Sequence, residues 1–446
     1  MKCCFSGSHD VEMMKFALIN PAWTFAGSTY FGCHDPHYPL ELLFAHDQIA
    51  AAGHDALLVD AQNDRLSLDE ARERVRRFAP DFLVIPTAPS YLFWRCPPPE
   101  LRVPMEWFAA LGDGATTVAI GPHGSATPAA TLRKTGCNVV MRGEPDQTLA
   151  RLAGEPWEQI PGCCFRRNDG TFHISPELGV TDMKALAALT FDNYNVEGHE
   201  HRHHVFSGTG RGAELEFARG CPWSCSFCNK TLFRNKFRER DVGAVIAEVD
   251  RLLARGVSYI YFIDEIFGVG KNVRRLMEAL AERKVQIGLQ TRIDLWDEES
   301  LDLLGRAGCI SMEVGIESIT DEGRDELNKN CRISTARITE LLIYARTKIP
   351  WVQANLILTD KDDKGEIRAW QENLKEHGVW VSEPVPMFPY PGSPSYVEIF
   401  KALPDDRAWE RAHRYYTSLF ADKGYSDIQE QKPVPLEELE SAQHAA

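Results

Sequence analysis

The sequence has no long apolar run, and this absence argues against a membrane-spanning protein. None of its hydrophobic stretches reaches the ~18 residues that a transmembrane helix needs. Residues 1–15 also lack the continuous apolar segment of a secretion signal. We therefore expect a cytoplasmic protein with no membrane span. The sequence shows no internal repeat and no low-complexity segment, and its 44% hydrophobic and 25% charged residues exclude wholesale disorder and collagen-like repeats.

Positive charge is also scarce. The chain carries 49 Lys and Arg against 64 Asp and Glu, a formal net charge of −15. A surface this acidic repels phosphate backbones, so no nucleic-acid partner is expected without a local basic patch. The densest basic run, residues 234–240, is interrupted by Glu239 and lies beside a cysteine motif. The balance of charge favours a small-molecule substrate.

The first 154 residues alternate short apolar runs with amphipathic helices. Strands are expected at 16–20, 55–60, 81–86, 116–121 and 138–141, and helices at 39–53, 68–78 and 128–135. This alternation predicts an α/β domain over residues 1–154, a doubly wound parallel sheet of the Rossmann type. Ligands of such sheets bind beyond the carboxyl ends of the strands.

The second half resumes the alternation after a break. Residues 155–212 are rich in Pro, Gly, Asp and His and predict a linker, with a small hairpin around 168–170. Strands are then expected at 215–218, 259–263, 286–291, 311–316, 352–358 and 381–386. They predict a partial TIM barrel over residues 213–398, with its site at the carboxyl ends of the strands. Residues 399–446 predict a helical tail that frays into polar sequence.

Three of the twelve cysteines form the strongest motif. Cys221, Cys225 and Cys228 have the spacing CxxxCxxC and directly follow a predicted strand. Three thiolates in one loop can hold three corners of a 4Fe-4S cluster. No fourth cysteine follows at ligand spacing, so one iron would be open to an exogenous ligand. The alternatives are buried thiols or a zinc site, but zinc would need a fourth ligand nearby, and we favour the cluster.

With this loop, residues 213–395 resemble the radical S-adenosylmethionine (SAM) superfamily. The resemblance implies that Cys221, Cys225 and Cys228 ligate the cluster and that the open iron chelates SAM. An electron from the cluster then cleaves SAM to methionine and a 5′-deoxyadenosyl radical. The implied partner is a reductant such as flavodoxin or ferredoxin.

The same resemblance suggests further SAM contacts along the barrel. Asp264 and Glu265 end the second barrel strand, where the family places a Gly-Gly-Glu-like motif against the SAM amino group. Arg292 ends the third strand and could pair with the SAM carboxylate through two hydrogen bonds. Glu317 ends the fourth strand, at the position of a ribose contact. Each of these residues could instead be a solvated strand end or part of a structural salt bridge. Residues 389–392 (PYPG) resemble a loop of cobalamin-binding members.

Residues 16–152 resemble the cobalamin-binding domain that precedes the barrel in one large radical SAM group. The matching pieces, in order, are residues 19–21, 39–42, 52–54, 78–81, 121–125 and 142–146. Gly, Ser and Thr loops at strand ends let the backbone and hydroxyl groups approach a corrin. The residues expected there are Thr87, Ser90, Gly121, Ser125 and Thr127.

The lower axial ligand of cobalt is left open between two readings. Many cobalamin proteins use a DxHxxG motif after the first strand, and this chain has Asp35-Pro36-His37 there without the glycine. His37 could therefore ligate cobalt. It could also merely precede the helix, as in relatives whose cobalt lacks a histidine ligand, and we favour this second reading.

The histidines within residues 199–204 and three further cysteines could be functional or could have no role in a site. The run of histidines at 199–204 could bind a metal, but a solvated loop is favoured. Cys33, Cys96 and Cys137 raise the methylthiotransferase branch, which binds a second cluster. These three cysteines do not match its usual strand-end positions, and the C-terminal tail is too short and acidic for its RNA-binding module.

The resemblance as a whole implies a cobalamin-dependent radical SAM enzyme that methylates an unactivated carbon of a small metabolite. One SAM would convert cob(I)alamin to methylcobalamin, and a second would give the 5′-deoxyadenosyl radical that activates the substrate. The enzymatic alternative is a cyclisation or rearrangement with the same cofactors. A non-catalytic corrinoid carrier is a third reading, against which the open-iron motif argues.

Overall fold

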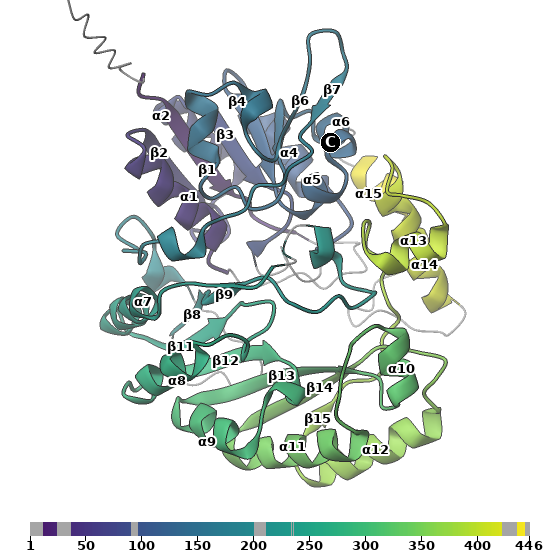
Figure 1. Cartoon of the computed structure of the whole chain (residues 1–446). Helices are drawn as coiled ribbons and strands as arrows, with labels where there is room; N and C mark the ends of the chain where they lie inside the picture. The colour runs from purple at the N-terminus through teal and green to yellow at the C-terminus, as the bar shows by residue number, and fades with distance from the viewer. Residues whose placement is uncertain are drawn as a thin grey trace, which may run out of the picture.

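The computed structural model describes residues 12–24, 37–90, 97–199, 211–232, 234, 236–421 and 435–441. Two α/β units lie one above the other, and the C-terminal helices run along one side of the N-terminal unit (Figure 1). Among the residues described, no helix is both long and apolar enough to cross a bilayer.

The N-terminal unit is a seven-stranded sheet with the order β2-β1-β3-β4-β5-β6-β7. Its parallel strands are β1 (Lys15–Asn20), β2 (Asp55–Asp60), β3 (Phe82–Pro86), β4 (Thr116–Ile120) and β5 (Val139–Met141). The helices are α1 (Leu40–Ala51), α2 (Leu68–Phe78), α4 (Arg102–Leu111), α5 (Pro122–Ala126) and α6 (Pro128–Thr135). The predicted doubly wound sheet is confirmed, with α4 and α5 as helices that the sequence did not reveal.

The hairpin predicted around residues 168–170 belongs to this sheet. Its strands, β6 (Cys163–Arg166) and β7 (Phe172–Ile174), pair antiparallel beside β5. The sheet is therefore mixed, and the predicted linker provides two of its strands. The rest of that segment carries short 3₁₀ turns, namely η1 (Leu149–Ala153), η2 (Trp157–Gln159), η3 (Met183–Ala185) and η4 (Val196–Gly198).

The strand order of the N-terminal sheet places a topological switch point, and with it the expected ligand crevice, at the carboxyl edge. From β1 the chain crosses to β2 on one side, whereas β3 lies on the other side of β1. The loops that follow β1 and β3 therefore diverge, and such a switch point is where open α/β sheets bind ligands. This crevice is called the switch-point crevice below.

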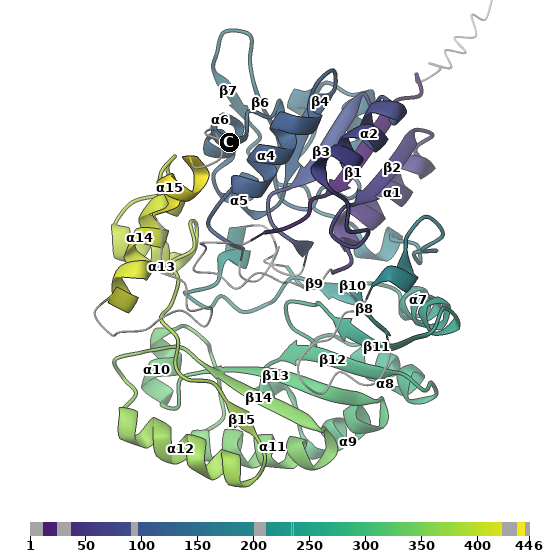
Figure 2. The same ribbon diagram turned by 180° about the vertical axis from the view of Figure 1, so that it is seen from behind.

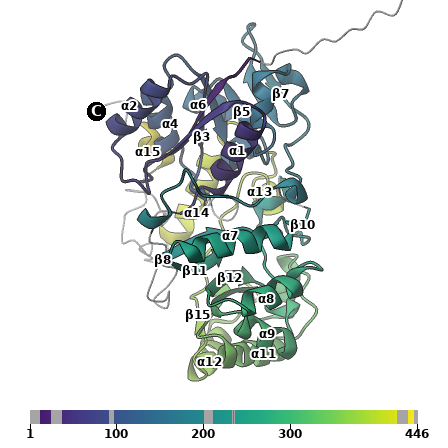
Figure 3. The same ribbon diagram turned by 90° about the vertical axis from the view of Figure 1, so that its left-hand side faces the viewer.

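The second unit is a six-stranded parallel sheet with the order β15-β14-β13-β12-β11-β8. The strands are β8 (Arg211–Leu215), β11 (Val257–Phe262), β12 (Gln286–Thr291), β13 (Cys309–Glu317), β14 (Trp351–Leu356) and β15 (Trp380–Val381). Its helices are α7 (Val242–Ala254), α8 (Val273–Ala281), α9 (Glu298–Arg306), α10 (Asp321–Glu326), α11 (Thr335–Lys348) and α12 (Lys364–Glu376). Helices α8, α9, α11 and α12 cover the face of this sheet that points away from the N-terminal unit (Figures 1 and 3).

The first strand of this sheet lies earlier than predicted. It ends at Leu215, and a separate short strand β9 (Ala218–Arg219) pairs with β10 (Arg238–Glu239). The prediction of a strand at 215–218 was wrong because Asp264 accepts hydrogen bonds from the backbone amides of Phe217 and Ala218 at 2.8 and 2.9 Å. These bonds turn the chain out of the ladder just before the cysteine motif.

The C-terminal segment returns to the N-terminal unit. Its helices are α13 (Pro394–Phe400), α14 (Ala408–Ala421) and α15 (Leu436–Ser441), beside α5 and α6 (Figure 2). The indole of Trp409 donates to the Thr127 hydroxyl at 3.1 Å, and Glu440 accepts from the Leu101 amide and the Lys134 ammonium. The predicted helical tail therefore includes α15, which these contacts hold in place.

Candidate cofactor sites at the domain interface

The three motif cysteines lie in the loop that follows β9. A glycine opens this loop, and Gly220 has φ +84°, a conformation that side chains disfavour. A Cβ there would lie 2.1 Å from the carbonyl oxygen of Lys236. Gly220 therefore lets the chain pass close to the returning backbone before Cys221.

Hydrogen bonds from neighbouring segments fix the shape of this loop. The ammonium of Lys230 donates to the carbonyl oxygens of Cys221 and Trp223. The Ser226 amide donates to the Leu327 carbonyl at 2.9 Å, and the Asn328 amide group donates to the Ser224 carbonyl at 2.7 Å. The loop is thus tied at both ends and to the segment after α10.

The three thiols fit a four-iron cluster better than a zinc ion. Burial raises the pKa of each thiol, most of all that of Cys228, while the Lys230 charge acts in the opposite direction. Bound iron favours the thiolate, so it would reverse this effect. Within the described ranges, no three His, Cys, Asp or Glu side chains stand at the spacing of a single metal ion. A four-iron cluster holds its cysteines further apart, and three thiolates leave its fourth iron open.

Asp264 and Glu265, predicted as SAM contacts, support the loop instead. Both oxygens of Asp264 accept the backbone amides before β9, and burial raises the pKa of this carboxyl well above its usual range. Glu265 accepts from the Gly220 amide at 2.7 Å and from Arg234 at 2.5 Å. The contact of these carboxylates with SAM stays a prediction, whereas their hold on the loop is seen directly.

The remaining predicted SAM residues gather near Cys225, whose thiol pKa responds to the charges of both Glu317 and Arg292. Arg292 already forms a two-pronged pair with Asp294 at 2.9 and 2.7 Å, and its guanidinium lies 4.4 Å from the Trp223 ring centre. Its pairing with a SAM carboxylate stays a prediction. Beside it lies a cavity of about 300 Å³, lined by Trp223, Asp294, Leu295, Asn330, Arg332 and Ile333.

Lys329 is a residue of this site that the sequence did not reveal. It is only 4% exposed, lies beside Cys225 and donates to Glu317 at 3.3 Å. Glu317 itself has φ +70° at an irregularity between β13 and β14. No local pattern distinguishes Lys329 from a surface lysine, because its burial depends on the turn of the chain after α10.

Of the residues expected to contact cobalamin, Thr87 and Ser90 lie in the loop after β3, at the switch-point crevice. The Thr87 hydroxyl is buried and has no hydrogen-bond partner in the described part of the chain. Ser90 donates to Glu41, at the start of α1. This pair spans the crevice from the loop after β3 to the helix after β1.

Gly121, Ser125 and Thr127 lie after β4 and bind the chain itself. Gly121 has φ +111°, and the Ser125 hydroxyl donates to its carbonyl oxygen at 2.8 Å and accepts from the Gly143 amide at 2.9 Å. Thr127 donates to the His123 carbonyl at 3.1 Å and accepts the Trp409 indole. These three residues shape the edge of the sheet, and their contact with a cofactor stays a prediction.

The edge of the N-terminal sheet fits a large polar ligand. The Nδ1 atom of His123 is a second buried polar atom without a partner among the described residues, and burial lowers the pKa of this ring to about 3. Buried polar atoms are normally hydrogen-bonded, and unsatisfied ones mark positions where another molecule completes the bonding. A corrinoid carries many amide groups that could do so at the Thr87 and His123 atoms.

His37 points toward the other unit. Its Nε2 atom lies 3.8 Å from Glu214 on β8, which also accepts the Tyr38 amide. His199 lies 3.2 Å from the same carboxylate and 3.0 Å from the Gly212 carbonyl. The role of His37 toward cobalt stays a prediction. The reading of residue 199 as a solvated loop was wrong, since this side chain is buried; residues 200–204 lie outside the described residues.

Arg219 joins the cysteine loop to the N-terminal sheet. It forms a two-pronged pair with Asp146, at 2.7 and 2.9 Å, and a third bond to Glu216 at 2.8 Å. All three side chains are buried. Burial acts to raise the pKa of Asp146, but the guanidinium outweighs it and holds this pKa below its usual range.

A second arginine repeats the arrangement. Arg238 donates to both oxygens of Glu144, at 2.9 and 2.5 Å, and to the Thr181 carbonyl at 2.7 Å. Glu144 and Asp146 belong to the RGEPD segment, residues 142–146, one of the pieces whose sequence resembles a cobalamin-binding domain. In the structure this segment clamps the cysteine loop to the carboxyl edge of the other sheet. The clamp is defined here as Glu144, Asp146, Arg219 and Arg238.

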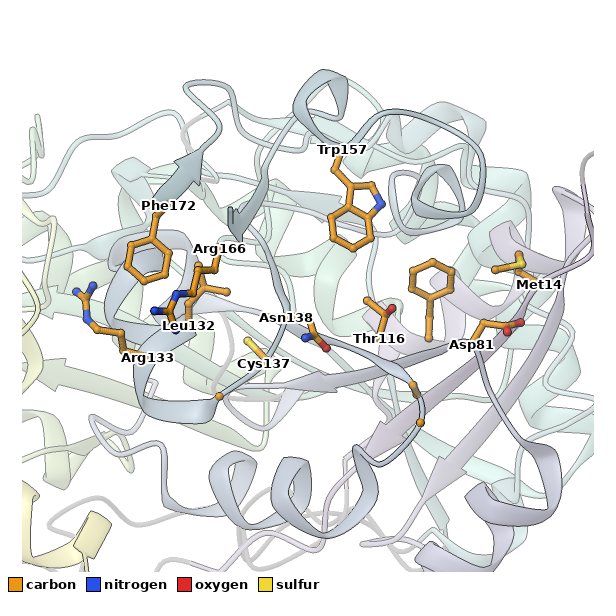
Figure 4. A pocket seen from close by; sticks show the side chains of 14 residues that line it. Met14, Asp81, Thr116, Leu132, Arg133, Cys137, Asn138, Trp157, Arg166 and Phe172 are labelled. Carbon is orange, nitrogen blue, oxygen red and sulfur yellow. The ribbon is translucent and has the colours of Figure 1, made fainter. Parts of the chain in front are cut away.

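Another cavity lies at the opposite edge of the N-terminal sheet. It measures about 890 Å³, and Asp81, Thr116 and Asn138, at the amino ends of β3, β4 and β5, face it together with Trp157 and Phe172 (Figure 4). This edge is far from the crevice and the cysteine loop, so the cavity takes no part in the site.

Comparison with known proteins agrees with this geometry. The model of the radical SAM superfamily matches residues 215–370. The chain is 24% identical to an uncharacterized methyltransferase, PH0819, of Pyrococcus horikoshii, over 69% of this chain and 66% of the relative. It is 29% identical to the hopanoid C-3 methylase of Methylococcus capsulatus, over 80% of this chain and 68% of the relative. The chain is also 23% identical to the anaerobic magnesium-protoporphyrin IX monomethyl ester cyclase of Cereibacter sphaeroides, over 86% of this chain and 64% of the relative. The chain spans about two thirds of the length of these relatives.

Two solved structures share the arrangement of both units. The radical SAM methyltransferase TsrM from Kitasatospora setae, with cobalamin and a [4Fe-4S] cluster, matches with a TM-score of 0.68 and 17% identity, over 87% of this chain and 78% of that one. The cobalamin-dependent radical SAM enzyme OxsB matches with a TM-score of 0.71 and 12% identity, over 98% of this chain and 71% of that one. These matches agree with the prediction made from three cysteines and a preceding Rossmann-type sheet: residues 215–370 match the radical SAM superfamily, and the chain has the fold of cobalamin-dependent radical SAM enzymes.

Proposed function

We propose that this chain is a cobalamin-dependent radical SAM enzyme that methylates a carbon atom of a small molecule. The observation that carries the proposal is the clamp, which holds the cysteine loop against the carboxyl edge of the N-terminal sheet. It brings the expected cluster and the switch-point crevice to one interface. Relatives named as a methyltransferase and a methylase, at 24% and 29% identity, support the choice of methyl transfer.

The bound groups would supply the electron transfer and the methyl group, and the chain's own residues would hold them. Cys221, Cys225 and Cys228 would ligate the cluster, and Lys230 keeps their loop in one shape. Lys329 places a buried positive charge beside the thiolate of Cys225. The two buried atoms at Thr87 and His123 would receive amide groups of the corrinoid. A small one-electron donor such as flavodoxin or ferredoxin is the expected partner.

The test uses SAM with a trideuterated methyl group. The protein is reconstituted anaerobically with iron, sulfide and hydroxocobalamin and reduced with titanium(III) citrate. Mass spectrometry then measures labelled methyl on the corrinoid and free 5′-deoxyadenosine. We expect both products, and we expect C225S to retain the corrinoid but form no 5′-deoxyadenosine, because one cluster ligand is lost. Failure to label the corrinoid would contradict methyl transfer.

A cyclisation or rearrangement is the second candidate. It is favoured by the cyclase relative, which matches 86% of this chain. The same experiment separates the two, since 5′-deoxyadenosine without any label on the corrinoid would favour this candidate. A corrinoid carrier without radical chemistry would form neither product.

A further inference from the structure

Glu41 is a buried acid at the switch-point crevice. It lies in the first turn of α1, and the Ser90 hydroxyl, from the loop after β3, donates to its Oε2 atom. These two elements are the ones that diverge from β1 and β3. The Glu41–Ser90 pair therefore stands across the opening where sheets of this kind bind their ligands.

One oxygen of this carboxyl lacks a partner. Glu41 is 3% exposed, and its Oε1 atom makes no hydrogen bond within the described residues. The buried Thr87 hydroxyl, in the loop after β3, also makes no hydrogen bond within the described residues. Because a buried carboxyl oxygen without a hydrogen-bond partner is destabilising, its position at the crevice points to a ligand that supplies the missing partner.

The surroundings allow the Glu41 carboxyl to act either as a hydrogen-bond donor or as an acceptor. Burial raises the pKa of Glu41 to about 7, and the hydrogen bond from Ser90 and the charge of Arg234 lower it only in part. Glu216 is the other charged group that influences it, with the opposite sign. Near neutral pH the group is present both as an acid and as a carboxylate, so it can donate to or accept from an amide.

His37, the residue in this region that could ligate cobalt, contacts the other unit. Its ring lies beside Glu214 on β8, in the other unit. Glu41 follows it by four positions and is directed into the N-terminal unit through Ser90. Glu41 is the one of these two side chains whose hydrogen bond to the β3 loop is seen directly.

We propose that Glu41 binds a peripheral amide group of the corrinoid through Oε1, with Ser90 as its positioning residue. The inference rests on the proposed function, because it assumes that the crevice receives a corrinoid. It adds a contact and a specificity: the site distinguishes an amide at one position of the ring from a carboxylate. Above its pKa of about 7, the ionised Glu41 would repel a carboxylate placed there.

The test compares two classes of corrinoid in each protein. Hydroxocobalamin and its monocarboxylate derivatives, in which a single peripheral amide is a carboxylate, are titrated into the anaerobic, cluster-reconstituted chain. The readout is the ratio of the dissociation constants within one variant, so it does not depend on how much of that variant is folded. E41Q keeps the size of the side chain and its oxygen for Ser90, and E440Q removes a buried acid at another interface as the matched control.

At pH 8, where Glu41 is mostly ionised, the wild type and E440Q should bind one monocarboxylate derivative about tenfold more weakly than hydroxocobalamin, because a hydrogen bond that involves a charged group is replaced by repulsion. In E41Q this ratio should fall close to one. An unchanged ratio in E41Q, or equal affinities for all derivatives in the wild type, would overturn the inference and leave the proposed function in place. Failure of the wild type to bind hydroxocobalamin would overturn both.

Discussion

Replacing Asp146 by asparagine should loosen the cysteine loop without disturbing either sheet. Asp146 lies 73 residues before Arg219 and accepts two of its hydrogen bonds, at 2.7 and 2.9 Å. The D146N variant keeps the size of the side chain but removes its charge. The Arg219 guanidinium would then be buried with a hydrogen bond to Glu216 at 2.8 Å and with Glu144 3.7 Å away.

The magnitude follows from the burial of the pair. Removing one partner of a buried ion pair costs about 3–5 kcal/mol, and the remaining bond to Glu216 favours the lower end. Since every 1.4 kcal/mol changes an equilibrium about tenfold, 3 kcal/mol corresponds to roughly a hundredfold more frequent opening of the loop. The pKa of Asp146 is held low in the fold, so its contribution is present at neutral pH and is lost only as the solution is acidified through that lowered pKa.

Hydrogen exchange of single amides measures this opening. The informative amides are those of Gly220, Cys221 and Ser226, which donate to Glu265, to the Arg234 carbonyl and to the Leu327 carbonyl. In reduced, cluster-free protein at pH 7, we expect D146N to raise their exchange rates about a hundredfold, while amides inside β1 and β12 keep theirs.

The control is E440Q, which removes a buried acid that binds Lys134 and the Leu101 amide. It should accelerate exchange near α15 and leave the loop unchanged. Unaltered exchange of the loop amides in D146N, or acceleration of the same size in E440Q, would refute the clamp as the element that holds the cysteine loop.

Further predictions concern the crevice, the loop and the C-terminal helices. Burial raises the pKa of Glu41 from 4.5 to about 7. Its contribution to the free energy of unfolding is therefore fully present below pH 4.5, and about 3 kcal/mol of it is lost as the pH rises through 7. E41Q should raise the urea midpoint at pH 8 and leave it unchanged at pH 4.5. The G220A variant should lose most of its iron after reconstitution, because the added methyl group meets the backbone at 2.1 Å, whereas G53A, with φ +86° and nothing within 4 Å, should load normally. Replacing Trp409 by phenylalanine removes the bond to Thr127 and should lower stability by about 1 kcal/mol; a urea midpoint equal to that of the wild type would contradict this.

The sequence predicted elements whose signal is local. The strand over 55–60 and the helices over 68–78 and 128–135 have the bounds expected. Apolar periodicity and the Ser67 cap of α2, whose hydroxyl accepts from the Glu70 amide, act within a few residues of each element. The cysteine loop is predictable for the same reason, because the CxxxCxxC spacing lies within eight residues and indicates ligands of a four-iron cluster.

The parts that were missed or misplaced depend on distant partners. Nothing near Arg219 indicates that it binds Asp146, and nothing near His37 indicates that it faces Glu214. The hairpin after β5 was recognised, but its place as an edge of the first sheet depends on pairing with β5 and not on its own residues. Acids at strand ends look alike in a sequence, and the structure shows that Asp264 binds the backbone of the chain itself.

The most direct test of the account is the content of iron and cobalt in one preparation. The chain is purified without oxygen, reconstituted with iron, sulfide and hydroxocobalamin, and desalted before metal analysis. We predict about four irons and one cobalt per chain, since three cysteines hold one four-iron cluster and the switch-point crevice holds one corrinoid. Four irons without cobalt would contradict the central claim that both groups meet at this interface.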